Sequence, residues 1–156
     1  MSSRSTFRRA LPLAAALVLA GAAQADAPPS KGEQALTYRK AVYQVIFWNV
    51  RPMTAMAQDK VPFNAQEFAM RAGRVAELAP MLSEAYPPES KGVANSKLKP
   101  EMWANRADFD AKLKDLVDRS AALADVAKGG DAAKTKTAFF SLMDACKACH
   151  EKYKAD

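Results

Sequence analysis

The chain has 156 residues, of which 23 are Lys or Arg and 17 are Asp or Glu, so its formal net charge is +6 at pH 7. The basic residues are interspersed with acidic ones and form no basic run, which argues against a nucleic-acid-binding protein. After residue 25 the sequence contains no low-complexity tract and no repeat of fixed period, and its length favours one domain with a core.

Residues 1–25 have the pattern of a secretory signal peptide. Three arginines and no acid precede the apolar run LPLAAALVLAGAA, and the small-x-small ending AQA closes the segment. The apolar run is too short to span a membrane, which takes roughly 20 residues, so we expect no stable membrane insertion. An N-terminal anchor that is not cleaved is the alternative. Cleavage after Ala25 leaves residues 26–156, with 20 basic and 17 acidic side chains and a net charge of +3.

The remaining sequence divides at Pro-, Gly- and Ser-rich places into four segments with helical periodicity. The first helix is expected from about Glu33 to Gln58, with a kink at Pro52, because proline removes a backbone donor and clashes with the preceding turn. The second begins after VPFN, where Asn64 and Glu67 predict a capping box, and ends around residues 80–86. The apolar positions expected to face inward on these helices are Tyr38, Val42, Val45, Ile46, Phe68, Ala72, Val75, Ala76 and Ala79.

The link at residues 87–103 is too rich in Pro, Gly and Ser to be helical throughout. The third helix is expected over residues 105–127 and ends at two glycines, after which Asp131 caps the fourth helix over residues 132–154. No segment shows the strict alternation of a half-buried strand. The sequence therefore predicts an all-α, antiparallel four-helix bundle, whose helices are long enough to enclose a cofactor.

The fourth segment carries the pentapeptide CKACH, which contains both cysteines and the one histidine of the chain. Cys146, Cys149 and His150 stand at i, i+3 and i+4 of a helix, so we expect the two thiols and the imidazole to project together into the bundle interior. C-x-x-C-H is the signature of covalent haem attachment, in which the thiols add across the porphyrin vinyl groups and the adjacent histidine binds the iron.

Other chemistries of two cysteines and a histidine fit the sequence less well. A structural zinc site normally needs four nitrogen or sulfur ligands, and this chain offers three. A redox-active C-x-x-C typically lies at a helix start in a βαβ context, whereas this pair lies near a helix end. A disulfide, the usual state of a lone cysteine pair in an exported protein, stays open beside the haem.

Three segments are similar to parts of a known family. YRKAVYQVIFWNV resembles its first helix, PEMW the entry to its third helix, and CKACHEKYK its last helix. On these segments the chain resembles cytochrome c′, a class II c-type cytochrome, over essentially all of residues 26–156. The resemblance implies a periplasmic protein with one covalent haem c per chain, held by Cys146 and Cys149 with His150 as the axial iron ligand. It also implies a homodimer packed through the first two helices.

The same resemblance brings further residues to the haem. Arg39 matches an arginine that pairs with a haem propionate, and a solvated surface arginine is the alternative. Met102 and Trp103 are expected near the haem edge, with a plain core role as the alternative. Lys154 stands four residues after His150, where family members usually carry an arginine; lysine offers a point charge in place of a planar fork.

The chain has no second histidine that could bind the distal face of the iron, the face opposite the axial histidine, and this excludes bis-histidine ligation. Low-spin relatives use a methionine of the first helix there, and the matching position here is Tyr43. A neutral phenol is a poor iron ligand, and Met53 and Met56 lie about 15–20 Å further along the helix. We therefore expect a five-coordinate, high-spin haem with Tyr43 crowding its vacant face; Val42 or Phe47 covering the iron is the alternative.

Two functions match this interpretation. The first is a gas-binding haem protein that takes up nitric oxide and carbon monoxide and sequesters nitric oxide; the second is an electron-transfer cytochrome with a periplasmic redox partner. An enzyme is disfavoured, because no distal acid–base pair accompanies the one histidine. Phe47, Trp48 and Val50 face outward beyond the needs of one inward stripe and are the expected partner surface, with haem contact as the alternative.

Overall fold

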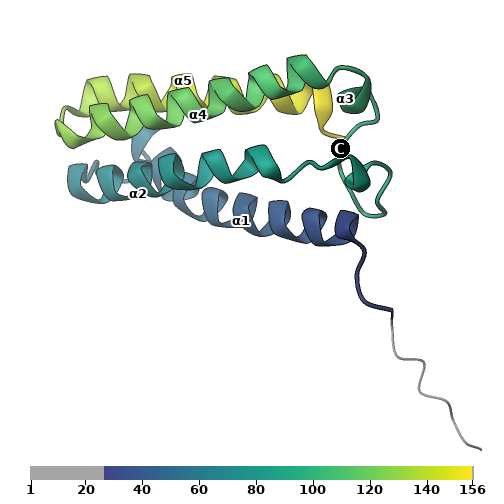
Figure 1. Ribbon diagram of the computed structural model, residues 1–156. Helices are drawn as coiled ribbons and strands as arrows, with labels where there is room; N and C mark the ends of the chain where they lie inside the picture. The colour runs from purple at the N-terminus through teal and green to yellow at the C-terminus, as the bar shows by residue number, and fades with distance from the viewer. Residues whose placement is uncertain (1–26, 156) are drawn as a thin grey trace, which may run out of the picture.

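Helices make up the architecture of residues 27–155, the part of the chain that this computed structural model describes (Figure 1). Along the chain they are α1 (Lys31–Ala57), α2 (Ala65–Leu78), η1 (Ala79–Glu84), η2 (Pro88–Ser90), α3 (Glu101–Ala104), α4 (Arg106–Lys128) and α5 (Ala132–Tyr153). Within these residues the β-type pairing is limited to one isolated bridge between Leu98 and Lys154. The all-α prediction is confirmed, and the predicted signal peptide, residues 1–25, lies outside the described residues.

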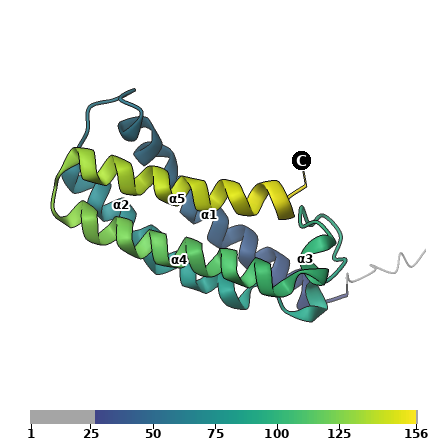
Figure 2. The ribbon, with the colours of Figure 1, turned by 90° about the horizontal axis from the view of Figure 1, so that it is seen from above.

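The four long helices, α1, α2, α4 and α5, run alternately up and down the bundle (Figure 1). The closest packing is between α4 and α5, between α2 and α4, and between α1 and α2, whereas α1 and α5 are not closely packed against each other. The link from η1 to α3 gathers at the end of the bundle where α1 begins and α5 ends (Figures 1 and 2). This end therefore holds both the loop-rich part of the chain and the last turns of α5.

Side-chain caps fix where the helices begin. Ser30 and Glu33 form a complete capping box at α1, and the Asp131 side chain accepts from Lys134 N at 3.0 Å at α5. At α2, Asn64 Oδ1 accepts from Glu67 N at 3.0 Å, which is one half of the predicted box, while the Glu67 carboxylate binds Arg71 Nε at 2.8 Å. These bonds satisfy backbone N–H groups that the first helical turn leaves without a partner.

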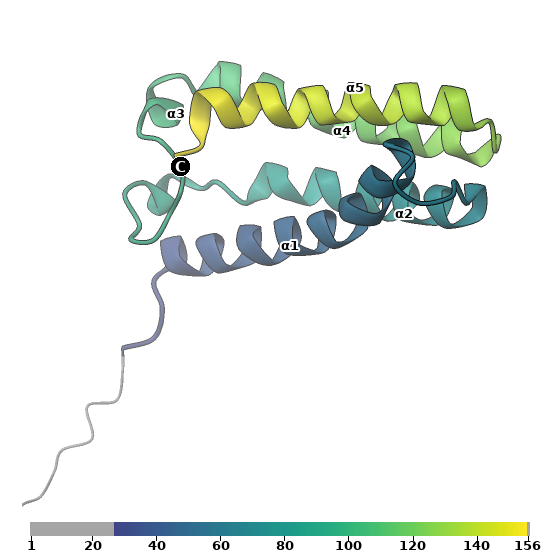
Figure 3. The same cartoon turned by 180° about the vertical axis from the view of Figure 1, so that it is seen from behind.

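Pro52 lies inside α1, and the last turns of α1, before the connection to α2, bend away from the axis of the earlier turns (Figure 3). Proline has no N–H to donate to the carbonyl four residues earlier. Around it, side chains bond to the backbone: Asn49 Nδ2 donates to the Val45 carbonyl at 2.8 Å and Thr54 Oγ1 to the Val50 carbonyl at 3.0 Å. The missing N–H of Pro52 is the local cause that we assign to the predicted kink.

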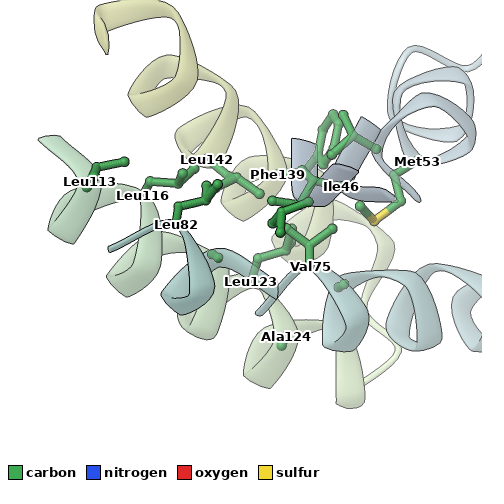
Figure 4. Close-up of a cluster of buried hydrophobic side chains, with 14 of the residues drawn as sticks. Ile46, Met53, Val75, Leu82, Leu113, Leu116, Leu123, Ala124, Phe139 and Leu142 are labelled. Carbon is green, nitrogen blue, oxygen red and sulfur yellow. The ribbon is translucent and has the colours of Figure 1, made fainter. Parts of the chain in front are cut away.

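The core lies between all four long helices, as the cluster around Phe139 and Leu142 of α5 shows (Figure 4). Burial of a large apolar side chain contributes roughly 1.5–3 kcal/mol, so this cluster is the main source of stability. Two predicted orientations were wrong: Val50 is buried at 8% exposure, whereas Val45 is exposed at 47%. Each lies at the border of its helix's apolar face, where periodicity alone does not separate core from surface. No helix in the described part of the chain is long and apolar enough to cross a membrane.

Replacing Gly32 with alanine is expected to lower the free energy of unfolding by about 1–3 kcal/mol. A Cβ at this position would lie 2.2 Å from the Glu89 carbonyl oxygen and 2.7 Å from Val93 Cγ2, because the first turn of α1 packs directly against η2. Urea denaturation measures the change. Gly73→Ala in α2 is the matched control: its Cβ would meet nothing within 4 Å, so it should gain about 0.5–1 kcal/mol from helix propensity. Equal effects of the two substitutions would contradict the close packing at Gly32.

Candidate functional site

The last two turns of α5 carry the two thiols and the imidazole of the CKACH motif. Cys146 and Cys149 are half-buried and pack against the core, but His150 is exposed. The prediction that all three project into the interior was therefore wrong for His150. Successive helical residues are about 100° apart, which puts His150 at the edge of a face centred on the buried Leu142 and Tyr153.

Both cysteines are free thiols, and burial is the main cause that raises the pKa of each. Across residues 27–155, no three His, Cys, Asp or Glu side chains converge closely enough to hold a metal ion. The two thiols and the imidazole therefore do not share a single-ion site of the zinc type. The two thiols and the imidazole lie one after another along one side of α5, an arrangement that suits a larger group to which each of them bonds at a different atom.

Tyr43 of α1 faces the motif from across the bundle. Its side chain is half-buried, and both thiols lie near enough to contribute to raising its pKa, after burial and the neighbouring Tyr86. Its hydroxyl lies 2.9 Å from the hydroxyl of Tyr86. A phenol with a raised pKa stays neutral at physiological pH and is a poor ligand for iron. The structure thus places Tyr43 near both thiols and in a hydrogen bond with Tyr86.

Arg39 lies one turn before Tyr43 and is buried, with 4% of its surface exposed. Its Nη1 donates to the Ala85 carbonyl at 3.3 Å, its Nη2 to Ser96 Oγ at 3.0 Å, and its Cζ lies 5.2 Å from the centroid of the Tyr86 ring. All these partners are neutral, and nothing in the described chain supplies Arg39 with a carboxylate. Burial lowers its pKa.

A buried cation loses its hydration and needs an anionic partner to offset that loss. The Arg39 guanidinium therefore suits a carboxylate of a bound group, such as a haem propionate, near Ser96. The alternative, a solvated surface arginine, is excluded by the burial of the side chain.

The other predicted site residues divide between core and surface. Met102 is fully buried, and Trp103 is half-buried and lines a pocket of about 260 Å³ together with Ser96. Lys154 is exposed and lies near enough to His150 to help lower its pKa, second to burial. Its backbone N donates to the His150 carbonyl at 2.9 Å, which closes the last turn of α5.

The methionines of α1 that were excluded as iron ligands lie in the core. Met53 is fully buried, and Met56 Sδ accepts from Asn64 N at 3.5 Å, in the connection between α1 and α2. Of the alternatives for the distal face, Phe47 is 63% exposed, whereas Val42 is buried. Phe47 therefore points away from the interior.

Sequence reasoning missed Tyr86 and Ser96. Both lie outside the α-helices, in the region from η1 to α3, where no periodicity marks a residue as inward-facing. Tyr86 is nonetheless buried, and Ser96 contacts the guanidinium of Arg39. Only the return of this link across the end of the bundle brings them to the site.

Comparison with known proteins gives the same assignment along the whole bundle. Residues 34–154 match the family model described as Cytochrome C′. A cytochrome c′ from Allochromatium vinosum is 32% identical over 147 residues, which cover 91% of this chain and 94% of the relative. The solved cytochrome c prime from Shewanella frigidimarina aligns with a TM-score of 0.78 and 35% identity over 83% of this chain and all of that one.

Two further solved structures bear on ligands and assembly. A nitric oxide complex of a mutant cytochrome c prime from Alcaligenes xylosoxidans has a TM-score of 0.75 and 26% identity, covering 83% of this chain and 99% of its own. A cytochrome c′ described as having an unusual ligand-controlled dimer dissociation has a TM-score of 0.73 and 34% identity, covering 83% of this chain and 100% of its own.

Proposed function

The chain belongs to the cytochrome c′ family, which carries covalently bound haem c, and we propose from this premise that it binds nitric oxide and carbon monoxide at a five-coordinate, high-spin iron. The position of Tyr43 is the observation that carries the proposal: it packs against the same buried cluster as both cysteines, and both thiols contribute to raising its pKa. This residue places a neutral, poorly ligating group on the face that a second ligand would otherwise occupy. Sequestration of nitric oxide is the biological use that we propose for this chemistry.

The chain's residues divide the work of holding the haem. Cys146 and Cys149 attach it, and His150, the one histidine of the chain, binds the iron. Arg39 binds a propionate, and Met102 and Trp103 pack near the haem edge, with Lys154 beside the proximal histidine. When bound, the haem supplies an iron atom with one free coordination position. Tyr43 would crowd that position, so only small diatomic molecules would enter, and they would do so by displacing its ring.

The comparison structures support the gas-binding part of the proposal, because one of them is a nitric oxide complex. An enzyme of the peroxidase type is not favoured, since His150 is used by the iron and leaves no histidine to act as a distal acid or base. The N-terminal pattern supports export of residues 26–156 to the periplasm after cleavage at Ala25.

The absorption spectrum of the ferrous protein tests the proposal directly. We expect a high-spin spectrum that changes on addition of carbon monoxide or nitric oxide, because a vacant position binds either gas. Split low-spin bands that neither gas alters would contradict the proposal.

That opposite outcome would favour the second candidate, an electron-transfer cytochrome with a periplasmic redox partner. The exposure of His150, with the exposed Lys154 near it, supports this candidate; the neighbouring Lys147 and Lys152 are ion-paired with Glu151 and Asp108. Such a surface brings positive charge and the proximal side of the site within reach of an acidic partner.

Replacing Trp48 with glutamate is expected to convert a homodimer into a monomer. We propose that two chains pack through α1 and α2, because Phe47 and Trp48 are 63% and 74% exposed on α1, and exposed aromatic patches mark interfaces. A buried, unpaired carboxylate at such an interface is strongly unfavourable. Sedimentation velocity measures the change. Phe140→Glu, an equally polar change at an exposed position of α5, is the control and should leave the dimer intact; a dimer that survives Trp48→Glu would place the interface elsewhere.

A further inference from the structure

Tyr86 is held on several sides although it lies in the link between η1 and η2. It is 5% exposed, and its ring packs edge-on against Phe109 with centroids 4.7 Å apart and planes at 77°. The Arg39 guanidinium lies over the ring, and the Tyr86 carbonyl accepts from Arg106 Nη1 at 2.9 Å. These contacts fix both the backbone and the ring, so the position of the Tyr86 hydroxyl is set by the surrounding structure.

Tyr43, by contrast, depends on Tyr86 for the orientation of its polar end. Its side chain is half-buried, and its hydroxyl bonds to the Tyr86 hydroxyl at 2.9 Å, the one hydrogen bond that this side chain forms with the described residues. A phenol ring rotates about two side-chain torsions, and a hydrogen bond at its tip restricts both. Tyr86, whose ring and backbone are fixed by several contacts, therefore restricts the orientation of Tyr43.

The hydrogen bond between the two hydroxyls can form in two directions, with either tyrosine as the donor. If Tyr43 donated, the proton of the buried Tyr86 hydroxyl would have no acceptor in the described chain, which is costly in an apolar environment. If Tyr86 donates, its own proton has an acceptor, and it is the Tyr43 proton that has none in the described chain. Burial raises the pKa of both phenols, so the pair stays neutral and the bond persists at physiological pH.

We propose that Tyr86 is a positioning residue of the distal face: its hydroxyl is hydrogen-bonded to that of Tyr43, holds that ring beside the thiols of α5, and thereby sets how readily a diatomic gas enters. The inference rests on the distal role of Tyr43 in the proposed function. A gas that binds must displace the Tyr43 ring, and the displacement breaks the bond to Tyr86. Removing the bond removes this resistance.

Carbon monoxide association with the ferrous holoprotein tests the inference. Because one net hydrogen bond opposes the movement of Tyr43, Tyr86→Phe is expected to increase the association rate about two- to tenfold. Tyr43→Phe removes the same bond from its other side and should act alike. The double variant should then equal either single variant, because the bond can be lost only once.

Tyr38→Phe is the matched control. Tyr38 is also on α1, but its hydroxyl donates to Glu84 Oε1 at 2.6 Å and takes no part in the bond between Tyr43 and Tyr86, so the rate should stay within about twofold of the original. The infrared C–O stretching band gives a second readout: it should broaden in Tyr86→Phe, where Tyr43 samples more orientations, and stay unchanged in Tyr38→Phe. Urea denaturation of each variant shows whether the fold is retained.

Three outcomes would overturn the inference. A Tyr86→Phe protein with the rate and the band of the original shows that Tyr86 does not hold Tyr43. Additive effects in the double variant show that Tyr86 acts by another route. If Tyr43→Ala binds gas as the original does, the distal role of Tyr43 itself fails, and this result identifies the proposed function as the part that is wrong.

Discussion

A variant with Cys146 and Cys149 both replaced by alanine is expected to lose covalent haem completely. The two thiols are the only cysteines of the chain, and both stand half-buried on one side of α5, where they can bond to one group. Without the thioether bonds the haem would be held by non-covalent contacts and by His150 alone. Haem staining after denaturing electrophoresis measures the loss, because only covalently bound haem remains with the chain.

Lys147→Ala is the control for this variant. Lys147 lies between the two cysteines in sequence but is exposed, so its removal should leave haem attachment intact. We also expect the double cysteine variant to be less stable, since the buried Arg39 would lose a firmly held anionic partner. Haem that remains on the double variant after denaturation would refute attachment through these thiols.

Tyr43→Ala is expected to increase carbon monoxide affinity roughly tenfold to hundredfold. The substitution removes both the ring that a gas must displace and its hydrogen bond to Tyr86; together these are worth about 1–3 kcal/mol. Titration of the ferrous protein with carbon monoxide, followed by absorption, measures the change.

Phe47→Ala on the same helix is the control for Tyr43→Ala. Phe47 is an aromatic residue one turn further along, but its side chain is largely exposed, so carbon monoxide affinity should stay near its original value. Equal affinities of the Tyr43→Ala protein and the original would remove Tyr43 from the distal face and leave Val42 as the predicted covering residue.

Much of the fold could be predicted because its signals are local. Asn64 and Asp131 mark helix starts through bonds that reach three residues along the chain, and Gly130 follows α4 with a φ of +71° that favours glycine. Pro52 disturbs α1 for a reason contained in its own ring. Such effects do not depend on distant parts of the molecule, so the expected helix boundaries agree with the structure to within a few residues.

The chemistry of the site was only partly predictable. The spacing of Cys146, Cys149 and His150 is a local property and indicates haem attachment by itself. The exposure of His150 is not local, because it depends on which neighbouring helices cover each side of α5. Val45 and Val50 were placed wrongly for the same reason: each lies at the border of the apolar face of α1, and only the packing of neighbouring helices decides whether such a position is buried.

The sequence by itself determined the helices, their order and the motif that takes the haem, because each follows from bonds and periodicities within a few turns of one segment. The tertiary structure decided the distal side. Arg39 is buried among neutral groups, and Tyr43 is bonded to Tyr86, 43 residues further along the chain. These contacts join α1 to the link between η1 and α3, which has no hydrophobic periodicity. They form only when the packed helices bring that link back across the end of the bundle.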